Sequence, residues 1–223
     1  MSEQRPDADT KFDASRATRA ERLDLCSYLE GLAPEAWSTP SLCPGWTVHE
    51  VVAHLTLSTR ETWPDFLVGM IKHRGNFDRL AATRAHERAL RNSATELVEQ
   101  LRVSADSTKR SPGSGPLDPL LDLLVHGQDI ARPLGHERRP PTDAAIAALD
   151  HALGSRWYGA RRRFGGVRLV ATDAEWTNGT GSEVRGPLSA FLLVATGRPA
   201  GLDGLAGDGL VILTPRLRPG TDS

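Results

Sequence analysis

Apolar residues recur at helical spacing along the first part of the chain, which predicts a series of amphipathic helices. The first helix is expected over residues 12–32. The second begins near Val48, because Thr47 and Glu50 have the spacing of a capping box, and it ends or kinks at Pro64.

The pattern continues with a long helical region over residues 76–103. Residues 104–116 are polar and rich in turn formers, which predicts a loop. Asp118 and Pro119 then have the N-cap and first-position pattern of another helix, which Pro133 closes. That helix is apolar nearly all round, so we expect it to be buried.

The pattern changes after residue 140, where we place a domain boundary between residues 1–139 and 140–223. The second part mixes helix and strand patterns. Its predicted elements are a helix over 142–158, a strand over 167–171, a turn at 178–181, a strand near Val184, a helix over 188–196 and a strand over 210–213. The fold class is therefore α+β, with a helical N-terminal domain and a small C-terminal α/β domain.

Three polar residues interrupt apolar helix segments. His54 lies within the sequence VVAHL, and Asp122 and His126 lie within LLDLLVH. Asp122 and His126 are four residues apart, so they share one helix face and can bind one ion together. Two imidazoles and a carboxylate leave one position of a zinc ion open, which is typical of catalytic zinc. The alternative is a plain i,i+4 ion pair between Asp122 and His126, although an apolar helix is a poor place for one.

Composition narrows the function classes. The 27 basic and 28 acidic residues give a formal net charge of -1, which provides no reason to expect a nucleic acid or an acidic membrane as partner. No apolar run is long enough to span a bilayer, and the first residues have no signal-peptide core. The two cysteines, Cys26 and Cys43, are expected to be reduced packing residues in a cytoplasmic protein.

Four motifs together resemble one known family. They are PGWTV at 44–48, VAHL at 52–55, LLVHGQDIAR at 123–132 and GR at 197–198. They are similar to the mycothiol-dependent maleylpyruvate isomerase family, which belongs to the DinB-like superfamily and is actinobacterial. The resemblance implies a DinB-like four-helix bundle that holds zinc, and a C-terminal domain that helps to close the site.

By position, His54 and His126 match the family's two histidine ligands, and Asp122 matches its glutamate ligand. Aspartate is shorter than glutamate by one methylene, roughly 1.5 Å. The helix must therefore approach the metal more closely, or the carboxylate binds through water.

The expected function is a metal-dependent enzyme that activates mycothiol for cis–trans isomerisation of, or S-transfer to, a small electrophile. Arg198 is the candidate cation for the substrate's carboxylate or developing enolate, with Arg185 a weaker candidate. Two alternatives stay open: a hydrolase that uses metal-bound water, and a non-catalytic binding or regulatory module that retained the fold. Asp129 could orient His126 or cap a loop. The oligomeric state, monomer or homodimer, is left open.

Overall fold

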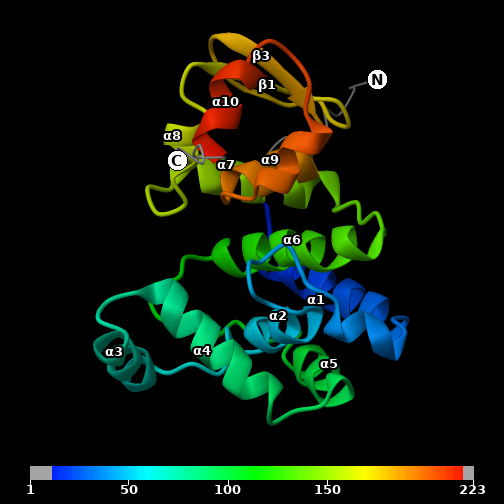
Figure 1. The fold of residues 1–223 in the computed structure, drawn as a ribbon, viewed down its shortest axis with the longest axis vertical. Helices are drawn as coiled ribbons and strands as arrows, with labels where there is room; N and C mark the ends of the chain where they lie inside the picture. Colours follow the sequence, from blue (N-terminus) through cyan, green and yellow to red (C-terminus); the bar gives the residue numbers. More distant parts are fainter. Residues whose placement is uncertain (1–11, 218–223) are drawn as a thin grey trace, which may run out of the picture.

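The computed structural model describes residues 12–217 and consists mostly of helices (Figure 1). A bundle forms the N-terminal part. Its elements are α1 (Ala14–Glu30), η1 (Pro34–Ser38), α2 (Val48–Leu55), α3 (Trp63–Lys72), α4 (Phe77–Ala89), α5 (Ala94–Val103) and α6 (Asp118–Ala131).

Helix starts in the bundle follow their capping residues. Thr47 and Glu50 form the predicted capping box at the start of α2. A second capping box, between Ser93 and Glu96, starts α5 and divides the long helix that was predicted over 76–103. The prediction that Pro64 ends a helix was wrong, because this proline lies in the first turn of α3, where its missing N–H has no helical partner to lose.

Helix α6 begins one residue earlier than its cap pattern suggests. Leu117 is the N-cap and Asp118 is the first helical residue, so the prediction of an Asp118 cap was wrong. The Asp118 carboxylate instead accepts hydrogen bonds from the Gly115 backbone N–H, from Tyr158 Oη and from the His151 ring. It thereby ties the start of α6 to the C-terminal part of the chain.

The C-terminal part is a small α/β layer. Its elements are α7 (Thr142–Gly154), α8 (Ala160–Arg163), β1 (Val167–Ala171), β2 (Thr177–Gly179), β3 (Ser182–Gly186), α9 (Leu188–Ala195), η3 (Pro199–Gly204) and α10 (Leu210–Leu217). A short helix that follows α6, η2 (Arg132–Leu134), packs Leu134 against the bundle core. The sheet has the order β2-β1-β3, with β2 antiparallel and β3 parallel to β1. The predicted α+β class is confirmed.

Two local predictions in this layer were wrong. Residues 178 and 179 belong to β2 rather than to a turn, and the chain reverses just after them, at Gly181. Gly181 has a φ of 117°, and a Cβ there would lie 2.2 Å from the Gly166 carbonyl oxygen, so only glycine fits. The segment 210–213 is the start of α10 and not a strand, because a short apolar run does not by itself distinguish a strand from a buried helix.

Helix α6 lies between the two layers (Figure 1) and contributes to two apolar cores. Leu123 and Ile130 pack into the bundle core with α1, α2 and α5. Leu121 and Leu124 pack into the core formed with α7, α9 and the sheet. This explains why α6 is apolar nearly all round, and it places any polar residue of α6 at the junction. The division at residue 140 stays a prediction.

None of the helices described for residues 12–217 is long and apolar enough to cross a membrane.

Candidate metal and thiol site

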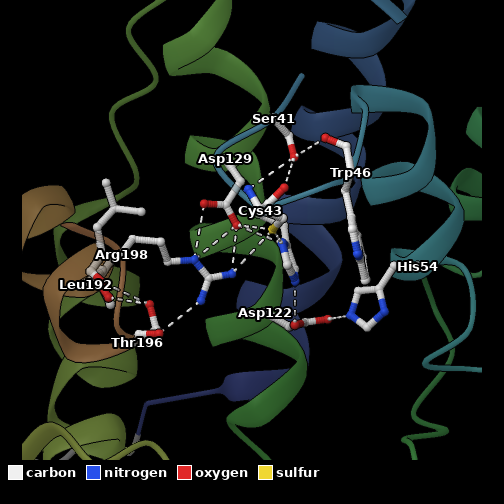
Figure 2. Close-up of polar contacts among 11 residues, drawn as sticks. Ser41, Cys43, Trp46, His54, Asp122, Asp129, Leu192, Thr196 and Arg198 are labelled. Carbon is white, nitrogen blue, oxygen red and sulfur yellow. Dashed lines mark hydrogen bonds and ion pairs between the residues drawn. The ribbon is translucent and has the colours of Figure 1, made fainter. Parts of the chain in front are cut away.

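His54 on α2 and Asp122 on α6 point toward each other (Figure 2), and His126 on α6 contacts the same Asp122 carboxylate. His126 Nε2 lies 3.3 Å from one Asp122 carboxylate oxygen, and His54 Nε2 lies 3.7 Å from the other. One ligand atom from each residue lies within 4.8 Å of the other two. The structure thus brings together the three residues predicted from the sequence, and we call them the metal triad.

The spacing within the metal triad is compatible with one bound metal ion. Zinc bonds of about 2.0–2.1 Å to nitrogen and oxygen place tetrahedral ligand atoms roughly 3.4 Å apart. The two triad distances, 3.3 and 3.7 Å, are close to this value. Asp122 reaches both imidazoles despite being shorter than the glutamate of the family pattern.

The His54 ring lacks hydrogen-bond partners. Its Nδ1 is buried with no partner in the described part of the chain, and its Nε2 is beyond hydrogen-bond distance of Asp122. A buried polar group without a partner is destabilising by roughly 1–3 kcal/mol. A metal ion would bond to Nε2, the nitrogen that faces Asp122, and would leave Nδ1 without a partner. The fit to a divalent ion therefore rests on the convergence of the two imidazoles and the carboxylate.

His126 is held from behind by Asp129. The His126 Nδ1 lies 2.9 Å from Asp129 Oδ2, so an N–H at this position donates to the carboxylate and leaves Nε2 facing Asp122. This arrangement fixes the ring and increases the basicity of the metal-facing nitrogen. The sequence left open whether Asp129 orients His126 or caps a loop, and the geometry corresponds to the first.

Asp129 is fully buried and accepts from two further side chains. Arg198 donates to it through Nε at 3.2 Å and through Nη2 at 2.7 Å, and the Cys43 thiol lies 3.1 Å from the same carboxylate. The remaining Arg198 nitrogen, Nη1, donates to the Thr196 carbonyl. We call Cys43, Asp129 and Arg198 the buried cluster.

His126 interacts electrostatically with a carboxylate of the metal triad and with the carboxylate of the buried cluster. Burial alone would lower the pKa of the His126 imidazole, but the neighbouring carboxylates of Asp122 and Asp129 raise it well above its usual value. Burial would raise the pKa of Asp122 and Asp129, and the imidazoles, with Arg198 beside Asp129, hold both pKa values below the usual range. His126 therefore carries a proton that a metal ion would displace.

A cavity of about 690 Å³ opens over the metal triad. The bundle contributes Trp46 and Phe77 to its lining, and the C-terminal part contributes Tyr158 and Arg198. The Trp46 ring lies edge-on to the His54 ring, with centroids 5.3 Å apart. A ligand in this cavity would thus contact both parts of the chain.

Sequence reasoning missed Cys43, which was expected to be a packing residue. Its thiol lines the cavity and contacts Asp129. Arg198 lines the cavity as expected, but its guanidinium pairs with Asp129. Arg185, the weaker candidate, pairs with Glu183 on β3 and does not line this cavity.

Comparison with known proteins agrees with this geometry. Residues 18–119 match the family model "Mycothiol maleylpyruvate isomerase N-terminal domain", a range that includes His54 and ends before Asp122. No curated protein matches the chain significantly.

Two solved structures share the fold: a mycothiol-dependent maleylpyruvate isomerase and its mutant with one histidine replaced by alanine. Each is 15% identical, with a TM-score of 0.56, and the alignment covers 87% of this chain and 91% of the other. The predicted resemblance is confirmed by the match of residues 18–119 to the mycothiol maleylpyruvate isomerase N-terminal domain family.

Proposed function

We propose that this protein is a metal-dependent enzyme that activates mycothiol for attack on a small electrophile. The observation that carries the proposal is the metal triad, in which three ligand atoms lie within 4.8 Å of one another beside a cavity. The family match adds the thiol, because the related enzymes are named as mycothiol-dependent.

The triad residues would hold a divalent ion, with zinc the best fit to two imidazoles and a carboxylate. Such an ion, when bound, lowers the pKa of a coordinated thiol so that it is a thiolate at neutral pH. Asp129 keeps the His126 Nδ1 proton in place and thereby presents the Nε2 lone pair. Asp122 contributes the negative charge that offsets part of the metal's charge.

The reaction we favour is cis–trans isomerisation, since the solved structures with this fold are named isomerases. The thiolate sulfur forms a bond to one carbon of a conjugated cis double bond, and the π electrons move onto the conjugated carbonyl. Rotation about the resulting single bond follows. The electrons then return, the carbon–sulfur bond breaks, and the thiolate leaves the trans product.

S-transfer begins with the same attack and differs only in its end. If the electrophile carries a leaving group, that group departs with the electron pair and the sulfur stays bound to carbon.

We further propose that the protein acts on small molecules in the cytoplasm, as a monomer or homodimer. Residues 140–223 would form the domain that helps to close the site.

Metal analysis of the purified protein tests the site. Wild type should hold close to one zinc per chain, His126→Ala should hold little, and His73→Ala, the same substitution away from the cavity, should match wild type. Absence of metal from wild type, both as isolated and after zinc addition, would favour the non-catalytic module.

Thiol consumption tests the chemistry. The zinc-loaded protein should accelerate the loss of mycothiol with a model electrophile, and His126→Ala should not. Acceleration of electrophile hydrolysis without any thiol would instead support the hydrolase.

A further inference from the structure

The charges around the cavity bear on the class of electrophile. Arg198 is the one arginine or lysine, among the described residues, that lines the large cavity over the triad. Its charge is offset by Asp129, which accepts from both Nε and Nη2. Asp129 is fully buried, so moving Arg198 toward a substrate would leave a carboxylate uncompensated in the interior.

The second cation near the triad is also paired. A small extension of about 40 Å³ borders His54 and Asp122 and is lined by Arg84. The Arg84 guanidinium forms an ion pair with Glu61 and donates to the Asp65 carbonyl. Neither arginine, therefore, offers a free positive charge to an incoming anion.

One acidic residue that lines the cavity, in contrast, has no counter-charge among the described residues. Asp78 lies in the first turn of α4, lines the large cavity, and has no hydrogen-bond or ion-pair partner among residues 12–217. With a divalent ion offset by Asp122 and a bound thiolate, the reacting centre is close to neutral, and Asp78 leaves the surrounding wall negative.

The rest of the wall is largely apolar and aromatic. Its members of this kind are Leu42, Pro44, Trp46, Phe77, Tyr158 and Pro199. A carboxylate that enters such a cavity loses hydration and gains no counter-charge, whereas an uncharged conjugated molecule gains contact with the rings.

We infer that this enzyme takes an uncharged electrophile with apolar or aromatic substituents rather than a dicarboxylate. The inference rests on the proposed thiol activation and identifies its substrate class. It separates this chain from the relatives whose name specifies maleylpyruvate, which is a dianion at neutral pH.

A pair of substrates with one reactive core tests the inference. Dimethyl maleate and maleate both isomerise by thiol addition and elimination, and they differ in charge. Each rate is measured with the zinc-loaded protein and mycothiol, and is divided by the rate with the thiol alone. The expected acceleration is at least about tenfold greater for the diester than for the dianion, because unpaired charge is disfavoured in the cavity.

A charge reversal on the wall gives the second arm. Asp78→Lys should raise the acceleration of maleate relative to that of dimethyl maleate by about threefold or more. Glu87→Lys is the matched control, because it makes the same charge change on α4 but does not line this cavity. It should leave both substrates unchanged.

Binding of unreactive analogues provides a readout that needs no turnover. With mycothiol present at saturation, dimethyl succinate should quench tryptophan fluorescence at lower concentration than succinate. Equal or tighter binding of succinate, or equal or greater acceleration of maleate, overturns the substrate class and leaves the proposed function intact. If neither maleate ester nor dianion is accelerated and no zinc is bound, the proposed function fails and this inference with it.

Discussion

The metal triad and the buried cluster are connected by the contact between His126 and Asp129, but they differ in how completely their polar atoms are paired. On the buried side, Asp129 accepts from three neighbouring side chains at distances between 2.7 and 3.2 Å. On the cavity side, the His54 Nδ1 has no partner in the described structure and the closest approaches to Asp122 are 3.3 and 3.7 Å.

The difference shows where a ligand can act. A carboxylate whose lone pairs are taken by donors is a fixed structural charge, and adding an ion there would require Arg198 to leave. A triad with long contacts and an unpartnered ring still has bonding capacity. The buried cluster thus stabilises and orients, and the metal triad is the part that binds.

The largest expected change in the free energy of unfolding comes from a substitution that breaks the ion pair of the buried cluster. Arg198→Met removes the cation and leaves Asp129 buried without a counter-charge, which should lower the free energy of unfolding by about 3–5 kcal/mol. Urea unfolding of the metal-free protein measures it. Arg139→Met is the control, because its ion pair with Glu137 is exposed and should contribute little to stability. Similar losses in the two variants would contradict the role given to the buried cluster.

A smaller change in the free energy of unfolding is expected when zinc binds to the metal triad. Zinc at a free concentration 100 times its dissociation constant should stabilise wild type by about 2.7 kcal/mol. Asp122→Asn should remove most of the stabilisation that zinc adds over the metal-free form of the same variant, since Asp122 is the shared carboxylate of the triad. Asp78→Asn, on the wall of the same cavity, should keep the gain. Unfolding curves with and without zinc measure both, and an unchanged zinc effect in Asp122→Asn would remove the carboxylate from the site.

The same contrast explains what the sequence could predict of the site. The metal triad was found because a polar residue in an apolar helix breaks a local pattern, and His54, Asp122 and His126 each do so. Cys43 and Arg198 break no such pattern. Their meeting at Asp129 depends on how the end of α9 packs beside α6, and that contact spans 69 residues of chain between Asp129 and Arg198.

The fold was predictable to a similar extent. The Thr47 capping box located the start of α2, because the signal lies within four residues. Pro64 was misread because a proline favours both the end of one helix and the first turn of the next. The segment that begins at Leu210 was misread as a strand because its apolar run is too short to reveal a period.

A second buried carboxylate, Glu21 on α1, can be compared with Asp129 through the pH dependence of stability. Glu21 is buried and pairs with Arg138 at 2.8 Å. Burial raises its pKa to about 7, despite the opposing effect of Arg138. Unlike Asp129, whose donors keep it ionised, Glu21 holds a proton in the folded protein that the unfolded chain has released between pH 4.5 and pH 7.

Stability should therefore fall as the pH rises through this range, by at most about 1.4 kcal/mol per pH unit from this group. Glu21→Gln cannot titrate, so the stability of wild type minus that of the variant should decrease from pH 4.5 to pH 7. Urea unfolding at four pH values measures the difference. Glu35→Gln, at an exposed position, should leave the slope of wild type unchanged. A flat difference for Glu21→Gln would mean that its carboxylate is ionised throughout, as in the buried cluster.

The smallest effect concerns the Cys43 thiol, which contacts the buried cluster from the cavity side. The thiol lies 3.1 Å from Asp129, whose other donors are His126 and Arg198, so it adds one weak donor to a carboxylate that is already paired. Cys43→Ala should lower the free energy of unfolding by about 0.5–1.5 kcal/mol, and Cys43→Ser, which keeps a donor, by less. Zinc affinity should stay within about threefold of wild type in both variants, because the Nε2 of His126 faces the triad and the thiol contacts the ring from its Nδ1 side. A large loss of zinc in Cys43→Ser with unchanged stability would instead make the thiol a metal ligand. The buried cluster would then bind metal as well, and it would no longer differ from the metal triad in this respect.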